Sequence, residues 1–146
     1  MNTTPKAMAV EQVLMKSALI RLNPKGNEMN ITLNIGLNVS KNYLPDGVAS
    51  MNLEYEYVKE YLEKVLGTPM QIGLSQSATE KTVVVAYSNV QDVLQKLFWL
   101  AHEFKQDCIA YSVQYAGRSL GGALVGEYAH QWNYGVFNEA YFIQLF

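Results

Sequence analysis

The order of hydrophobic patterns between Asn30 and Ala116 constrains the fold more than any other feature of this chain. The first segment alternates apolar and polar residues without interruption. Its apolar members are Ile31, Leu33, Ile35, Leu37 and Val39. This period of two predicts a β-strand with one buried face. The loop that follows contains Pro45-Asp46-Gly47, which predicts a turn because Pro presets φ and Gly accepts a positive φ.

A helix is predicted next, because apolar residues recur at intervals of three and four between Tyr57 and Val65. Gly67 stands where the glycine that ends a helix is expected. Two strands then follow. The first alternates between 70 and 75, and the second is the β-branched run 82–87, which predicts a central strand buried on both faces.

The second helix gives the strongest helical pattern of the chain. Its apolar stripe consists of Val90, Val93, Leu94, Leu97, Phe98, Ala101 and Phe104. Ser88 with Gln91, or Asn89 with Asp92, offers a capping box at its start. A fourth strand is then predicted from the alternation of Ile109, Tyr111, Val113 and Tyr115.

The order strand, helix, strand, strand, helix, strand predicts an α+β sandwich of the ferredoxin-like, split-βαβ kind. Its strands are expected in the spatial order 4-1-3-2, with both helices on one face. Leu120 to Val125 can add a fifth strand after a turn at Gly117. Residues 1–27 are interpreted as an N-terminal appendage, and 28–146 as a single domain that includes a C-terminal extension over 117–146.

Composition bears on the partners of the chain. Charged residues make up only 16% of it, against roughly 25% in typical soluble domains. Such a surface tolerates burial against a partner, so we expect a homodimer and a possible protein partner. The net charge of −2, without a basic cluster, argues against nucleic acid. No apolar run is long enough for a membrane span and no signal peptide is recognisable, so a cytoplasmic protein is expected.

Thiol and metal chemistry have little support in the sequence. Cys108 could act as a nucleophile only with His102 or His130 as its base, and a packing role is favoured for it. A metal site could use both histidines together with Asp107 and Glu127. Their spacing matches no diagnostic metal motif, so neither a metal nor another cofactor is predicted.

The C-terminal extension is aromatic and almost free of charge, the opposite of a disordered tail. We expect it to pack on the open sheet face, on the fourth strand's edge, or on a second subunit. Arg118 is the only lysine or arginine from Cys108 onward. It lies in a glycine-rich turn that lacks a phosphate-loop signature, and it either pairs with a carboxylate or holds an anionic ligand.

Two groups of residues are therefore candidates for contact with other molecules. A ligand pocket between the sheet and the C-terminal loop would use Arg118, His130, Trp132 and Tyr111. The interface candidates are Trp99, Tyr128 and Tyr134. Trp99 falls away from the apolar stripe of its helix, so either the N-terminal segment covers it or it is exposed for a partner.

Two classes of function remain open. The sequence favours a non-catalytic binding module that acts through the sheet face and the tail, such as a phage or mobile-element accessory protein that binds a host protein. The alternative is a small enzyme or ligand-binding domain with the pocket named above. Whether polar side chains converge on a concave site or are each used in packing distinguishes the two.

Overall fold

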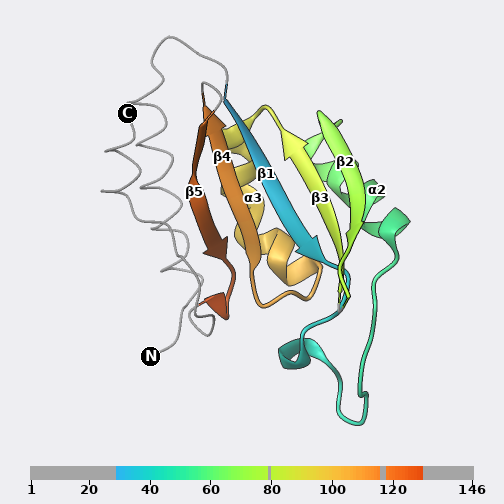
Figure 1. Cartoon of the computed structure of the whole chain (residues 1–146). Coiled ribbons are helices and arrows are strands. Elements are labelled where there is room, and N and C mark those ends of the chain that lie inside the picture. The colour runs from blue at the N-terminus through green and yellow to red at the C-terminus, as the bar shows by residue number, and fades with distance from the viewer. Residues whose placement is uncertain (1–28, 79, 116–117, 130–146) are drawn as a thin grey trace.

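A computed structural model describes residues 29–78, 80–115 and 118–129 of the chain (Figure 1). Five strands form one sheet in the order β2-β3-β1-β4-β5, and every neighbouring pair is antiparallel. The strands are β1 (Met29–Gly36), β2 (Gln71–Gln76), β3 (Lys81–Tyr87), β4 (Ile109–Tyr115) and β5 (Arg118–Val125). The predicted order 4-1-3-2 and the ferredoxin-like α+β fold are confirmed, and β5 extends the sheet beyond β4.

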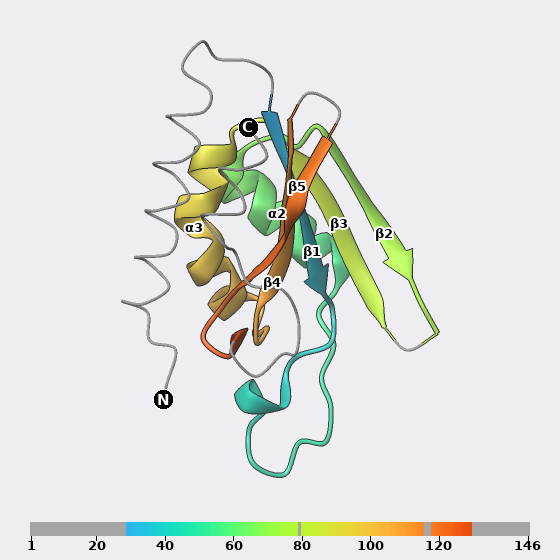
Figure 2. The same ribbon diagram turned by 60° about the vertical axis from the view of Figure 1, so that its left-hand side comes forward.

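The helices α2 (Tyr55–Leu66) and α3 (Val90–Glu103) cover the same face of the sheet (Figure 2). A short 3-10 helix, η1 (Lys41–Tyr43), lies in the connection between β1 and α2. Asn89 is the N-cap residue of α3, and its side chain accepts a hydrogen bond from the Asp92 amide at 3.1 Å, as one of the two predicted capping boxes requires. Gly67 caps the end of α2, and its φ of 83° suits glycine.

The strand β1 lies at the centre of the sheet. Ile31 pairs with Tyr87 of β3 on one side and with Val113 of β4 on the other. The alternation along β1 directs Ile31, Leu33 and Ile35 under the helices, where all three are fully buried. The core therefore lies between this face of the sheet and the two helices.

Two sequence expectations need correction. β3 is not buried on both faces, because only Val83, Val85 and Tyr87 on the helix side are fully covered, whereas Val84 and its neighbours on the opposite face remain partly exposed. The reason is that both described helices cover one face only. The first strand was expected to continue to Val39, but β1 ends at Gly36.

Several expectations concern residues that the structure does not describe. These are the N-terminal appendage over 1–27 and the part of the C-terminal extension that holds His130, Trp132 and Tyr134.

The predicted turn at Pro45–Gly47 is present, since the Val48 amide donates to the Pro45 carbonyl at 3.1 Å and Gly47 has a φ of 83°. In the described ranges, neither helix combines the length and the apolar character that crossing a membrane requires.

Candidate ligand-binding site

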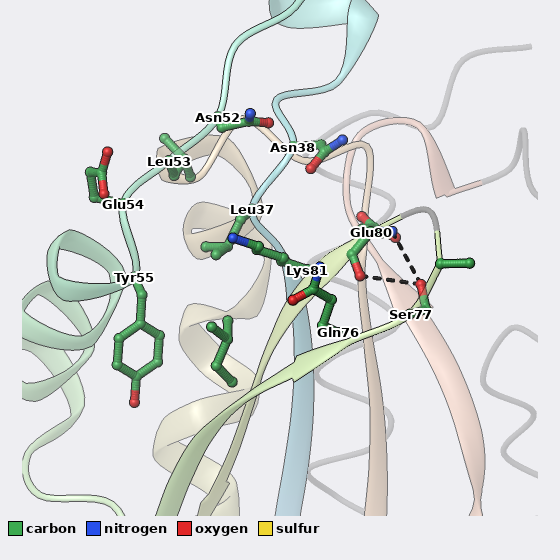
Figure 3. A pocket seen from close by; sticks show the side chains of 12 residues that line it. Leu37, Asn38, Asn52, Leu53, Glu54, Tyr55, Gln76, Ser77, Glu80 and Lys81 are labelled. Carbon is green, nitrogen blue, oxygen red and sulfur yellow. Dashed lines mark hydrogen bonds between the residues drawn. The ribbon is translucent and has the colours of Figure 1, made fainter.

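A pocket of about 470 Å³ opens at one end of the helix-covered face, between the β2–β3 hairpin and the segment that leads into α2 (Figure 3). We call it the hairpin pocket. Its lining residues are Leu37, Asn38, Asn52, Leu53, Glu54, Tyr55, Leu74, Gln76, Ser77, Ala78, Glu80 and Lys81. A volume of this size lies within the range of small-molecule sites, roughly 300–1,000 Å³.

Backbone hydrogen bonds fix the wall of the hairpin pocket that precedes α2. The Leu53 amide donates to the Leu37 carbonyl at 2.7 Å, and the Val39 amide donates to the Met51 carbonyl at 2.8 Å. The same stretch forms an isolated bridge between Asn38 and Asn52. The segment therefore continues the sheet for a short distance beyond β1 before it turns into the helix.

The β2–β3 hairpin supplies the opposite wall. The Ser77 amide donates to the Glu80 carbonyl at 2.9 Å, and the Ser77 hydroxyl accepts from the Glu80 amide at 3.1 Å. At the base of the hairpin, Gln76 pairs with Lys81. Because these bonds close a tight turn, they fix the backbone from which the side chains of Gln76 and Lys81 project.

The floor and one side of the pocket are apolar. Leu37 is 5% exposed and joins the core, and Leu53 and Tyr55 are partly buried against that core. Leu74 of β2 is 49% exposed, although it lies on the helix-covered face of the sheet. α2 begins only at Tyr55, so this end of the sheet is left without a helix above it.

Three charged residues surround this apolar surface. In Figure 3 the Lys81 side chain extends from β3 into the pocket, while Glu54 and Glu80 lie on opposite sides of it. Lys81 forms no salt bridge with any residue in the described ranges. Glu54 occupies the N-cap position of α2 without making a side-chain capping bond. A ligand with both an anionic and a cationic group would thus find partners of both signs.

The Glu80 carboxylate lies close to Gly36, although Glu80 as a whole is exposed. A Cβ atom at Gly36 would collide with Glu80 Oε2 and would lie 2.8 Å from Gln106 Oε1. Gln106 is itself 7% exposed, and its Nε2 donates to the carbonyls of Asn38 at 3.0 Å and Phe104 at 2.9 Å. Gly36 is therefore required for the Glu80 carboxylate to lie where it does.

A second polar cluster lies at the same end of the sheet as the hairpin pocket, on the side of β4 and β5. The Tyr43 hydroxyl donates to Glu127 Oε2 at 3.3 Å, and His102 Nε2 lies 3.9 Å from the same oxygen. Burial, reinforced by the Glu127 carboxylate, raises the pKa of Tyr43 well above its ordinary value. The rings of Tyr43 and Tyr128 meet edge to face at 5.7 Å. The cluster thus joins η1 to α3 and to the end of β5 and serves packing.

Neither thiol chemistry nor a metal centre gains support from the described residues. Burial, followed by the charge of Asp107, raises the pKa of the Cys108 thiol to about 12, which keeps it protonated at neutral pH. In the ranges the structure describes, no three histidine, cysteine, aspartate or glutamate side chains are grouped to hold a metal ion.

The predicted ligand residues are not brought together at the hairpin pocket. Tyr111 is 3% exposed and belongs to the core. Arg118 is the first residue of β5, where its backbone lies opposite Tyr115 of β4. His130 and Trp132 lie outside the described residues. Of the interface candidates, Trp99 is 63% exposed and Tyr128 packs against Tyr43, whereas Tyr134 is not described.

The residues of the hairpin pocket were not identified from the sequence. Lys81 lies directly before the β-branched run 82–87 and has no part in the sequence predictions. The available signal was a lysine directly before an apolar strand, next to a turn that also holds a carboxylate. That signal is common in hairpins and becomes informative only when the segment around Leu53 is placed opposite it.

The chain is similar in structure to solved proteins of low sequence identity. No family model matches the chain, and no curated protein matches it significantly. One similar solved structure is a phage SAM lyase in complex with S-methyl-5'-thioadenosine, at 17% identity and a TM-score of 0.45. Another is a phage SAM lyase in the apo state, at 19% identity and a TM-score of 0.43. Each match covers 68% of this chain and 90% of the other.

These findings correct the function that the sequence favoured. The non-catalytic binding module is wrong as the leading interpretation, because both similar structures are named as enzymes. The alternative, a small enzyme or ligand-binding domain, fits the findings better. At this level of similarity the likeness concerns the fold and assigns neither a substrate nor a site residue to this chain.

Proposed function

We propose that the protein is a small enzyme or ligand-binding domain that takes a small amphiphilic molecule into the hairpin pocket. The observation that carries this proposal is the Lys81 side chain, which extends without a salt-bridge partner among the described residues into a pocket of about 470 Å³. An ammonium group in such a place is available to an anionic group of a ligand.

The other lining residues specify the rest of the ligand. Leu37, Leu53 and Tyr55 provide an apolar surface beside the lysine, which suits a hydrocarbon or ring portion. Glu54 and Glu80 provide carboxylates for a cationic group. A zwitterionic compound of amino-acid type, with an apolar part, meets all three requirements.

The lining also holds groups that can support catalysis. Lysine and glutamate are among the side chains that transfer protons in enzymes, and Lys81, Glu54 and Glu80 all line the pocket. We therefore expect proton transfer to or from the bound molecule at these residues.

Lys81→Met tests the proposal, because methionine retains an unbranched side chain and removes the charge. Binding is measured by calorimetry with a panel of zwitterionic compounds, including SAM, alongside the less charged S-methyl-5'-thioadenosine. A charge-assisted hydrogen bond contributes about 1.5–3 kcal/mol, so we expect roughly 10- to 100-fold weaker binding of the zwitterions. Turnover of any compound that binds is followed by chromatography.

Lys64→Met is the matched control, because Lys64 is exposed in the last turn of α2, at the end away from the pocket. It should leave both binding and melting temperature unchanged. The proposal fails if no zwitterionic compound binds the unsubstituted protein, or if Lys81→Met and Lys64→Met bind equally well while both remain folded.

A further inference from the structure

The outer edge of β2 is free of any strand in the described part of the chain, since β2 ends the sheet. Its sequence, QIGLSQ, contains no charge and no proline. Soluble proteins usually protect an edge strand with lysine, proline or a bulge, because unpaired N–H and C=O groups recruit another strand. β2 has none of these, and its pairing with β3 is regular from Gln71 to Gln76.

The hydrogen bonds of the hairpin show which backbone groups face outward. The Ser77 amide points toward β3, because it donates to the Glu80 carbonyl at 2.9 Å. N–H directions alternate along a strand, so the N–H and C=O groups of Ile72, Leu74 and Gln76 point away from β3. The side chains of these same residues lie on the helix-covered face. A strand added at this edge would satisfy their backbone groups.

The exposed apolar side chains of this edge also require cover. Leu74 is 49% exposed and Met70, just before the strand, is 56% exposed. On the opposite face, Gln71, Gly73 and Ser75 are small or uncharged and are exposed. Two copies of this strand could therefore approach each other without repulsion between like charges.

We propose that β2 pairs with β2 of a second copy of this chain, antiparallel, about a two-fold axis at Gly73. A two-fold axis perpendicular to the sheet keeps the helices of both copies on the same face, so facing residues must come from the same face of the strand. In this register Ile72 faces Leu74 of the partner subunit, and Leu74 faces Ile72 of the partner subunit. The sheet becomes continuous through the dimer.

The alternative register, centred on Leu74, is less favourable. It places Ile72 opposite Gln76 of the partner subunit, so only one apolar pair forms in place of two. The Gly73 register leaves glycine opposite glycine on the other face, where nothing lies within 4 Å of a Cβ atom at this position in the single chain. The Gly73 register also places Met70 of the partner subunit opposite Gln76, at the border of the hairpin pocket.

Cross-linking through an introduced cysteine tests this register. Gly73 lies at a non-hydrogen-bonded position of the proposed pair, where facing Cα atoms are about 4.5 Å apart, within the range that a disulfide spans. The variant Gly73→Cys is made in the full chain together with Cys108→Ser, which removes the single natural thiol. We expect most of it to become a covalent dimer under mild oxidation at micromolar concentration, with an unchanged melting temperature.

Two matched variants decide the outcome. Leu74→Cys with Cys108→Ser should cross-link at least tenfold more slowly, because in this register the two introduced thiols do not face each other. Asn42→Cys with Cys108→Ser, at an exposed position in η1, gives the background rate. Faster cross-linking at 74 than at 73 would overturn the register, and rates at both positions equal to the background would overturn the dimer.

The mass of the unmodified chain gives a measurement that does not depend on cysteine variants. Light scattering should report a dimer at micromolar concentration. Leu74→Lys should weaken dimerisation at least tenfold, because two ammonium groups would meet at the edge, whereas Val48→Lys, at an exposed apolar residue outside the strand, should not. A monomer for the unmodified chain, or a Leu74→Lys dimer of unchanged stability, contradicts the proposal. Neither result depends on the proposed ligand.

Discussion

The two sides of the helix-covered face are filled to different extents. On the side of β4, α3 buries seven of its residues, and Ile109 and Val113 of the strand are at most 2% exposed. On the side of β2, α2 buries only Val58 and Leu62, and Leu74 of the strand is 49% exposed. The hairpin pocket and the free strand edge both lie on the incompletely covered side.

Under the proposed function, this difference assigns stability and binding to different sides of one small sheet. Hydrophobic stabilisation grows with the apolar area removed from water, so the α3 side supplies most of it. The α2 side leaves apolar and charged groups exposed next to rigid backbone, which is what a ligand or a second strand requires. We therefore expect substitutions on the α3 side to change the free energy of unfolding, and substitutions on the β2 side to change binding.

The largest effect is expected for Leu97→Ala in α3. Leu97 is fully buried, and such a truncation costs about 2–5 kcal/mol because it leaves a cavity in a close-packed core. Met70→Ala, at a residue 56% exposed beside β2, should change stability by no more than about 0.5 kcal/mol. Urea unfolding at submicromolar concentration measures both. Equal losses for the two variants would remove the contrast between the sides.

A smaller loss is expected for Asp107→Ala, which tests the polar contacts of the α3 side. Asp107 Oδ1 accepts from the Ser40 hydroxyl and, at 2.9 Å, from Asn42 Nδ2, so it anchors the start of η1. Because these bonds are partly or fully exposed, we expect a loss of about 1–2 kcal/mol. The control is Asp46→Ala, in an exposed turn. If the two aspartate variants unfold at the same urea concentration, η1 is not anchored by this carboxylate.

Tyr87→Phe should stabilise the protein by about 1 kcal/mol at neutral pH. In the part of the protein that the structure describes, the buried Tyr87 hydroxyl makes no hydrogen bond, and phenylalanine removes an unsatisfied group. Tyr57→Phe serves as the contrast, because the Tyr57 hydroxyl donates to Glu103 Oε2 and its removal should not stabilise. Thermal unfolding of both variants measures the difference in sign.

The same tyrosine predicts how stability changes with alkaline pH. Burial, followed by the charge of Glu63, raises the pKa of Tyr87 from 10.0 to about 12. Between these values the unfolded chain loses a proton that the folded chain keeps. This contribution to stability is therefore complete below pH 10 and is lost as the pH rises toward 12. Tyr87→Phe should lose less stability than the unsubstituted protein over this interval, and identical pH profiles would contradict the assignment.

The smallest effect is expected for Trp99→Gln. Trp99 is 63% exposed on α3 and contacts mainly the rings of Phe98 and His102, so we expect a change of no more than about 0.5 kcal/mol. Quenching of Trp99 fluorescence by iodide in a Trp132→Phe background checks the exposure. A loss above about 2 kcal/mol would mean that this side of the molecule has a further cover, and that the comparison between the two sides is incomplete.

The sequence was sufficient for the order of the elements and for the buried faces of β1 and α3. The alternation around Leu33 and the stripe around Leu97 each reflect burial of one face, a local pattern that needs no knowledge of the partner. Gly67 and Asn89 mark helix ends because the conformations they favour are local as well. The strand order followed, because short connections leave few ways to arrange two βαβ-like units.

The position of the hairpin pocket could not be predicted from such local patterns. Sequence patterns directed attention to Arg118 and to the aromatic extension, whereas the described pocket is built from Lys81, Leu37 and Tyr55. These three residues come from β3, from the segment just after β1 and from the start of α2, and none of them is distinctive by itself. Only the tertiary structure decides that α2 begins too late to cover this end of the sheet.

The sequence by itself determined which residues avoid water and hence the class of the fold. The tertiary structure decided where that burial is incomplete, at the hairpin pocket and along the outer edge of β2. The physical reason is the range of the interactions involved. Periodicity depends on neighbours within one or two turns of the chain, whereas a cavity or a free edge depends on how far elements distant in sequence extend over one another.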